Sequence, residues 1–388
     1  MKRLLDVNWA MLLPMLALIV VGAVFIKSSG EARSVESLHI AWKSHLVTAA
    51  AGLALYAVLA ALDYRRVLTW SALPMLIVSV SLLVVVLLFG SKIYGGRRWL
   101  WFFQPSELAK LAVIIAGAQF FGGDSPCSRG WRGLVAGLAL LGVPAALILM
   151  EPDLGTALVL VPTVLAMMLA ARVCRVVLVP ILVAVLAFAA LMLGAIWWAE
   201  TRQTPEERAT AYARIPLMEH QKQRLKVFLF PDKDPYGGGW NLRQAKISIG
   251  SGSIHGKGIG KGDQKFLGYL PPSVSMNDFI FAVLAEETGF AGSAATLALF
   301  LALLLGGAYT AVRAGDDCGR LLAIGVTVLL FSHVYVNVAM SIGLMPITGL
   351  PLPFISAGKS FLVVLMAALG LVQSVNVHKQ RSIECWKK

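Results

Sequence analysis

The sequence carries little charge for a protein dissolved in water. Of its 388 residues only 14% are charged and 58% are hydrophobic, whereas a soluble domain has about a quarter charged residues. The apolar residues form long blocks, and segments such as 70–90 and 176–198 reach the roughly 20 residues that cross a bilayer as a helix. Because lipid offers the backbone no hydrogen-bond partners, such blocks must be helical. The sequence therefore predicts an all-α polytopic membrane protein.

Motifs for metal, nucleotide and hydrolase chemistry are also missing. The six histidines form no HxxxH or HExxH pair, which argues against a dedicated zinc site. The spacing of a Walker phosphate loop, a dinucleotide fingerprint in a βαβ unit and a GxSxG elbow are all absent. The four cysteines fit neither a zinc site nor a CxxC motif, and the topology predicted below puts all of them at or near the cytoplasmic surface, where thiols stay reduced: Cys127, Cys174, Cys318 and Cys385.

The net charge of +13 is of the sign that nucleic-acid-binding proteins carry. Lys and Arg lie mainly at the ends of the apolar blocks, as the positive-inside rule expects, and no basic groove interleaved with aromatic residues is present. The charge distribution therefore argues against nucleic-acid binding.

Ten apolar blocks follow one another along the chain, at 8–27, 39–62, 69–90, 105–121, 131–150, 154–172, 175–199, 278–312, 319–340 and 358–378. The first follows Met-Lys-Arg but is long and lacks a small-residue cleavage site, so it is predicted to be a retained helix. The fourth is short and contains Glu107 and Lys110, which makes it the weakest span by hydropathy. The eighth is longer than one span needs, which predicts a bend or an extension into the cytoplasm.

The short connections between the blocks predict the orientation. With the N-terminus inside, fourteen cations lie at cytoplasmic ends: Lys2, Arg3, Arg65, Arg66, Arg129, Arg132, Arg172, Arg175, Arg313, Arg320, Lys379, Arg381, Lys387 and Lys388. Seven lie in short external connections: Lys27, Arg33, Lys43, Lys92, Arg97, Arg98 and Lys359. The bias and the even number of spans predict that both termini are cytoplasmic.

One long hydrophilic stretch, residues 200–277, is predicted to lie outside as a single large ordered loop in an otherwise undivided membrane domain. Residues 206–226 are charged and are predicted to form a helix along the membrane surface. Past Pro231 the sequence is rich in Gly, Pro and Asp, which predicts an ordered loop or turns. We find no internal repeat and no second domain.

Ionisable residues gather near the predicted outer ends of several spans, where they mark a functional site or a buried pair. They are Arg97, Arg98, Glu107 and Lys110 around the fourth block, Glu151 and Asp153 between the fifth and sixth, and Asp278, Glu286 and Glu287 at the start of the eighth. In a compact bundle these groups would converge on one cavity open to the outer face. The alternative is a set of structural ion pairs that hold helices in register.

Two segments of the long loop combine glycine with lysine: KISIGSG from Lys246 and HGKGIGKG, which contains Lys257. Glycine lets backbone amides approach an anion and lysine supplies charge, a combination suited to a diphosphate. A flexible turn is an equally good interpretation of these residues.

Several motifs resemble those of the SEDS family (shape, elongation, division and sporulation) in their residues and in their order along the chain. These motifs are FPDKDP at 230–235, GWNLRQAKISIGSG at 239–252, HGKG at 255–258 and NDFIFAVLAEETGFAG at 277–292, together with RWL at 98–100, QPSELAK at 104–110, EPDLGT at 151–156 and LMPITGLPLPFIS at 344–356. They cover nearly the whole chain, and the QAKISIGSG run resembles the elongation type, RodA, more than the division type, FtsW. Ala357, Lys359 and Glu151 depart from the family pattern and leave the shape of the rim near the last span open.

The resemblance implies a ten-span glycosyltransferase of the bacterial inner membrane that polymerises lipid II, carried on polyprenyl diphosphate, on the outer face. It also implies a class B penicillin-binding protein, other elongation-complex proteins and membrane lipids as partners. The family's essential aspartate falls on Asp278, its functional Glu and Lys on Glu107 and Lys110, and its Pro-Asp-Leu-Gly aspartate on Asp153.

The chemistry of polymerisation then assigns roles as hypotheses. Asp278 is the general base for the acceptor sugar hydroxyl. The candidates to bind or support the diphosphate are Arg98, Lys110, Arg224, Lys246 and Lys257, with Glu107 orienting Lys110 and with a divalent cation, Mg²⁺ or Mn²⁺, as an additional option. The alternatives are a flippase that moves the lipid-linked precursor and a scaffold that recruits a transpeptidase.

Overall fold

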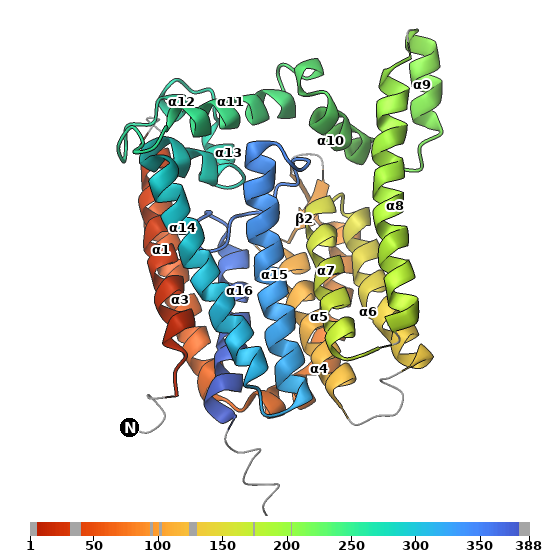
Figure 1. The fold of residues 1–388 in the computed structure, drawn as a ribbon, viewed down its shortest axis with the longest axis vertical. Coiled ribbons are helices and arrows are strands. Elements are labelled where there is room, and N and C mark those ends of the chain that lie inside the picture. The colour runs from red at the N-terminus through yellow and green to blue at the C-terminus, as the bar shows by residue number, and fades with distance from the viewer. Residues whose placement is uncertain are drawn as a thin grey trace, which may run out of the picture.

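Helices dominate the computed structural model, which describes residues 6–31, 40–93, 96–100, 103–123, 130–173, 175–202 and 204–379. A bundle of long helices stands under a layer of short ones (Figure 1). The long helices are α1 (Trp9–Gly30), α3 (Ala41–Ala61), α4 (Tyr64–Phe89), α5 (Pro105–Gly122), α6 (Trp131–Met150), α7 (Leu154–Ala170), α8 (Arg175–Glu200), α14 (Ile280–Val312), α15 (Asp317–Ile342) and α16 (Lys359–His378). Each of the ten apolar blocks coincides with one of them, which confirms the all-α polytopic class.

Length and hydropathy separate these helices. Within the described residues, eight are long and apolar enough to cross a membrane, namely α1, α3, α4, α6, α8, α14, α15 and α16. α7 is apolar but shorter, and α5 carries the buried charges Glu107 and Lys110. The ten-span topology therefore remains a prediction that depends on these two helices.

The centre of the bundle is formed by α15 and α16. Of the most apolar 18 residues of each helix, 67% are buried in α15 and 78% in α16, against 11% in α8, which stands at the edge (Figure 1). α16 packs along α3, α1 along α14, and α4 along α5. Asn376 Nδ2 donates to the backbone oxygen of Asp6, so the two ends of the described chain meet at the face opposite the layer of short helices.

The long α14 is bent, which is one of the two outcomes that its length predicted. Gly289 has non-helical angles, φ 68° and ψ −165°. At this bend the segment before α12 runs beside the helix, because Phe290 N donates to Ser253 O (2.8 Å) and Gly258 N donates to Glu287 O (2.9 Å). Glycine supplies both the positive φ and the space for this close approach.

Substitution of Gly289 by Ala is expected to destabilise the protein. A Cβ at this position would lie 2.4 Å from Gly256 N and 2.5 Å from Ile254 O, and the positive φ would be strained. We expect a loss of about 2–4 kcal/mol, seen as a lower melting temperature of the detergent-purified protein. Gly250→Ala is the control, since Gly250 is helical with nothing within 4 Å of a Cβ. Equal melting temperatures for the two variants would contradict this account of the bend.

The layer of short helices consists of α9 (Pro205–Ala213), α10 (Glu219–Leu229), the 3-10 turn η3 (Pro231–Lys233), α11 (Gly238–Ser251), α12 (Asp263–Phe266) and α13 (Pro272–Ser275). The single helix predicted over 206–226 is wrong: α9 and α10 are separate. Pro216 lies between them, and it lacks an N–H and disfavours helical geometry in the residue before it.

The prediction of turns past Pro231 is also wrong for α11. Leu242, Ala245 and Ile249 lie at helical spacing on one face, and they pack with Phe279 and Ala282 at the start of α14. The apolar face therefore outweighs the glycines at both ends of the helix. An antiparallel hairpin, β1 (Ser91–Ile93) with β2 (Gly96–Trp99), connects α4 to α5 and was not predicted.

The predicted cytoplasmic cysteines fall mostly outside the described residues, as Cys127, Cys174 and Cys385 do. Cys318 is described and lies half-buried in the first turn of α15. Asp316, next to this turn, accepts from Arg65 (2.6 Å), and α15 begins at the same face of the bundle as the two ends of the described chain (Figure 1).

Candidate active site

Asp278 lies in the turn between α13 and α14, outside the spanning helices. Asn337 of α15 donates to its backbone oxygen (3.0 Å) and to the backbone oxygen of Leu350 (2.7 Å). One carboxylate oxygen lies 3.6 Å from where a Cβ on Gly349 would stand. Asp278 is thus held where α14, α15 and the segment before α16 meet.

Two arginines and one carboxylate act electrostatically on Asp278. They are Arg224 of α10, Arg98 of β2 and Asp153 of the turn between α6 and α7. Arg224 donates to the backbone oxygen of Thr348 (2.8 Å), next to Gly349. Burial raises the pKa of Asp278 to about 6, although the two arginines act in the opposite direction. A carboxylate of this kind is ionised at neutral pH and is a stronger base than an exposed aspartate.

Arg98 and Asp153 are fixed by the turn between α6 and α7. Arg98 donates to the backbone oxygens of Glu151 (3.1 Å) and Pro152. Asp153 caps α7 by accepting from Thr156 N (3.1 Å), and its other oxygen accepts from Gln104 (3.0 Å). Burial, with Asp153 nearby, raises the pKa of Glu151 to about 8, so this side chain is mostly neutral at pH 7.

Glu107 and Lys110 form a buried ion pair deeper in the bundle. Their charged atoms are 2.8 Å apart, and the two side chains are 4% and 2% exposed. Lys110 Nζ also lies 2.9 Å from His333 Nε2, and the His333 ring stacks on Phe361. Sequence reasoning missed His333, although an ionisable residue inside an apolar block was itself a signal. Asp153 acts electrostatically on Glu107, which connects this group to the Asp278 site.

Neither lysine of the glycine-containing segments is among the charged groups that act on Asp278. Lys246 is exposed on α11, against Gly343 at the end of α15. Lys257 forms ion pairs with Glu286 (2.7 Å) and Asp263 (2.9 Å). The structure therefore brings together Asp278, Arg224, Arg98 and Asp153, and it separates Lys257 from them. The side chain of Arg97 lies outside the described part of the structure.

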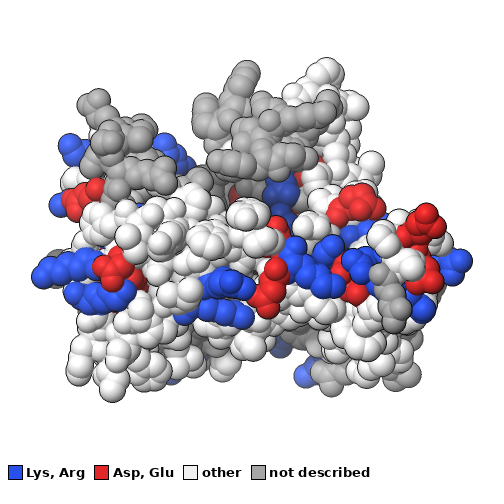
Figure 2. Space-filling model, turned by 90° about the horizontal axis from the view of Figure 1, so that it is seen from above, with Lys and Arg blue, Asp and Glu red and all other residues white. Residues whose placement is uncertain are grey.

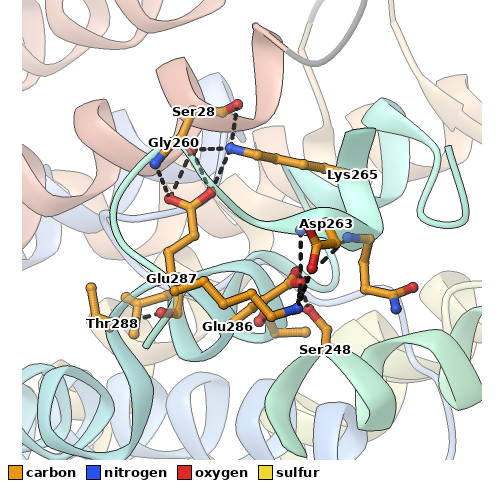
Figure 3. Close-up of polar contacts among 12 residues, drawn as sticks. Ser28, Ser248, Gly260, Asp263, Lys265, Glu286, Glu287 and Thr288 are labelled. Carbon is orange, nitrogen blue, oxygen red and sulfur yellow. Dashed lines mark hydrogen bonds and ion pairs between the residues drawn. The ribbon is translucent and has the colours of Figure 1, made fainter. Parts of the chain in front are cut away.

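Glu286 and Glu287 hold the glycine-rich loop on α14 (Figure 3). Glu287 accepts from Ser28 (2.6 Å) and Gly260 N (2.9 Å) and pairs with Lys265 (2.5 Å). Glu286 accepts from Ser248 (2.8 Å) as well as from Lys257. For these two glutamates the alternative of structural ion pairs holds.

The face formed by the layer of short helices carries both signs of charge. Figure 2 shows Lys and Arg interleaved with Asp and Glu in a band across this face. Several of them are paired, as Arg243 is with Asp232 and Lys222 with Glu219 (2.9 Å). Among the described residues, no group of three or more His, Cys, Asp or Glu side chains could hold a metal ion.

The site thus provides a partly buried carboxylate with a raised pKa, on which two arginines that can bind an anion act electrostatically. Such a site can remove a proton from a hydroxyl while it stabilises negative charge that develops nearby.

Comparisons with known proteins agree over nearly the whole chain. Residues 8–381 match the FtsW/RodA/SpoVE model, described as cell cycle protein. The chain is 36% identical over 376 residues to peptidoglycan glycosyltransferase MrdB of Escherichia coli K12, covering 95% of this chain and 93% of that one. It is 30% identical over 431 residues to peptidoglycan glycosyltransferase RodA of Treponema pallidum, covering 96% and 98%. Among solved structures, one chain of a peptidoglycan synthase complex that coordinates polymerization and crosslinking matches with a TM-score of 0.74 and 29% identity, covering 96% and 98%.

Proposed function

We propose, from the premise that this chain belongs to the FtsW/RodA/SpoVE family of cell cycle proteins, that Asp278 is the general base of its polymerisation reaction. The chain is a peptidoglycan glycosyltransferase of the RodA type, which acts in glycan polymerisation during elongation. The observation that carries the proposed role of Asp278 is its half-buried carboxylate at the meeting point of α14, α15 and the segment before α16, where Arg224 and Arg98 act on it electrostatically.

The proposed reaction joins two lipid-linked sugars. The 4-hydroxyl of the acceptor attacks the anomeric carbon of the donor, and Asp278 takes the hydroxyl proton as the new C–O bond forms. The bond from the anomeric carbon to the diphosphate oxygen breaks, and the polyprenyl diphosphate leaves with the electron pair. A single displacement inverts the anomeric centre, from an α-linked donor to a β-linked product.

Arg224 and Arg98 are the best-placed cations for the leaving diphosphate, because both act on Asp278 and both are anchored to backbone oxygens. Preorganised cations stabilise charge that grows in the transition state. Lys110 is buried between Glu107 and His333, so we assign it a supporting role. Lys246 and Lys257 remain candidates for binding more distant parts of the substrate.

A divalent cation, Mg²⁺ or Mn²⁺, is a further part of the proposal. Mg²⁺ is commonly held by one or two carboxylates together with substrate phosphates, so the lack of a three-ligand group among the described residues is compatible with it. Asp153, which acts electrostatically on Asp278, is the carboxylate that would hold it, so that Asp278 stays free to accept the proton. When bound, it would neutralise diphosphate charge.

We further propose an inner-membrane location with both termini cytoplasmic and a class B penicillin-binding protein as partner. The positive-inside bias supports the orientation. The similarity to one chain of a peptidoglycan synthase complex supports the partner.

A lipid II polymerisation assay tests this function. The purified protein, with and without a class B penicillin-binding protein, is incubated with fluorescent lipid II, and the glycan strands are resolved on a gel. Mg²⁺, Mn²⁺ and a chelator form three arms of the assay. A polymerase gives strands, whereas a flippase moves lipid II across vesicles without strands and a scaffold does neither. The absence of strands in every arm would contradict the proposal.

The rate of polymerisation should depend on pH through Asp278. Its carboxyl acts as a base only when ionised, and its pKa is raised to about 6. We therefore expect full activity at pH 7–8 and a loss as pH falls through about 6, roughly tenfold for each unit below it. A rate that is flat down to pH 5, in protein that stays folded there, would remove Asp278 from this role.

A further inference from the structure

The α8 helix is attached to the rest of the molecule mainly at its outer end. Along its length α8 exposes most of its apolar side chains, among them Val183, Leu186 and Leu191 at 58%, 61% and 64%. At its outer end Met192, Ile196 and Ala199 pack with Ala211 and Ile215, and also with Leu225 and Leu229 of α10. Figure 1 shows α9 beside the top of α8, with α10 leading from there across the bundle.

The polar centre of this attachment is Glu200, the last residue of α8. Its side chain is fully buried. It binds Lys226 of α10 (2.9 Å), Lys233 of η3 (2.5 Å) and the hydroxyl of Tyr212 of α9 (2.7 Å). One carboxylate therefore joins four elements, and charge-assisted hydrogen bonds of this kind are the strong ones.

The α10 helix carries this attachment on one side and part of the active site on the other. Lys226 and Arg224 are two residues apart, so they project about 200° from each other around the helix. Lys226 points to Glu200, while Arg224 binds the backbone oxygen of Thr348 and acts on Asp278. Any displacement of α10 from α8 must therefore move Arg224 relative to Asp278.

We propose that Glu200 is a positioning residue for the polymerase: it fixes α10 against α8 and thereby holds Arg224 at the Asp278 site. The inference rests on the proposed function and extends it to a residue that touches neither substrate nor Asp278. A change in the contact between α8 and α10 would therefore alter the position of Arg224 and the activity of the site.

The test is Glu200→Gln, which keeps the shape of the side chain and removes its charge. The charged groups that act on Asp278 are Arg224 of α10, Arg98 of β2 and Asp153 of the turn between α6 and α7. In this variant Arg224 is displaced and stabilises the ionised Asp278 carboxylate less, so the pKa of Asp278 rises. The acid limb of the pH–rate profile should therefore move to higher pH. We also expect kcat/KM at pH 7 to fall by roughly three- to tenfold.

Two further variants keep the test decisive if Glu200→Gln folds poorly. Tyr212→Phe and Lys233→Gln each remove one bond to Glu200 and should shift the limb less, in the same direction. Glu219→Gln is the matched control on α10, because it breaks the Lys222–Glu219 pair, in which Glu219 is 88% exposed. A carboxylate this exposed contributes little, and Lys222 keeps its hydrogen bond to the backbone oxygen of Tyr212 (2.8 Å), so the profile should match the wild type.

A double-mutant cycle with Arg224→Ala identifies the route. If Glu200 acts through Arg224, Glu200→Gln adds no further shift and no further loss in kcat/KM in the Arg224→Ala background. An equal effect in both backgrounds would overturn the proposal, and so would a lower melting temperature with an unchanged pH profile. The cycle in kcat/KM remains informative even if Asp278→Asn shows that Asp278 is not the base, so the two proposals can fail separately.

Discussion

Asp278→Asn is expected to lower the rate of lipid II polymerisation by about 10²–10⁴-fold, the usual contribution of a general base. Asparagine keeps the size of the side chain but cannot take a proton from the acceptor hydroxyl. The fold should survive, because Asn337 binds the backbone oxygen of residue 278 and not its carboxylate. The measurement is the rate of strand formation by purified protein, with the melting temperature recorded for the same preparations.

The matched control for this variant is Asp232→Asn. Asp232 is also a carboxylate of the layer of short helices, but its side chain is 82% exposed, it pairs with Arg243, and it is not among the groups that act on Asp278. We expect it to polymerise at the wild-type rate. Polymerisation by Asp278→Asn within about twofold of that rate would remove the catalytic role, since such a change is far below the contribution of a base.

The spanning helices were predictable because lipid offers the backbone no hydrogen-bond partners, so every residue of a span must be in a helix. The block predicted at 131–150 coincides with α6 (Trp131–Met150), and the block at 105–121 with α5 (Pro105–Gly122), despite the two charges it carries. Pro105 at the start of α5 is a start signal that does not depend on hydropathy. The bend in α14 followed from its length, although Gly289 as its position did not.

The site was predictable only in part, because pairing between charges is decided by tertiary contacts. Asp278, Arg98 and Asp153 do lie in one electrostatic group, as their predicted places near the ends of different spans indicated, and Arg224 of the long loop joins them. Lys257 was chosen on glycine and charge alone, and its ion pair with Glu286 spans 29 positions in the sequence.

The same limit explains the residues that were missed. Nothing in the sequence near His333 indicates that it meets Lys110, which is 223 positions away. Glu200 directly follows an apolar block and is the first residue of the predicted loop, yet its three partners make it a buried junction.

Glu107 and Lys110 give the second prediction with a large effect. Lys110→Met leaves the Glu107 carboxylate buried without its cation, and breaking a buried pair in this way costs about 3–5 kcal/mol. Glu107→Gln should cost less, because Lys110 keeps His333 at 2.9 Å. The measurement is thermal unfolding of the detergent-purified variants, together with the polymerisation rate of the fraction that remains folded.

The double variant Glu107→Gln with Lys110→Met separates stability from activity. Removing both charges is often neutral for a buried pair, so the melting temperature should recover most of the loss caused by Lys110→Met. Polymerisation should stay lower, on the order of tenfold, because the pair adjoins Asp153, which also acts on Asp278, and fixed charges near a reaction centre stabilise its transition state. If the double variant regains the full rate as well as the stability, the pair serves the fold alone, and the electrostatic group that matters for catalysis ends at Asp153.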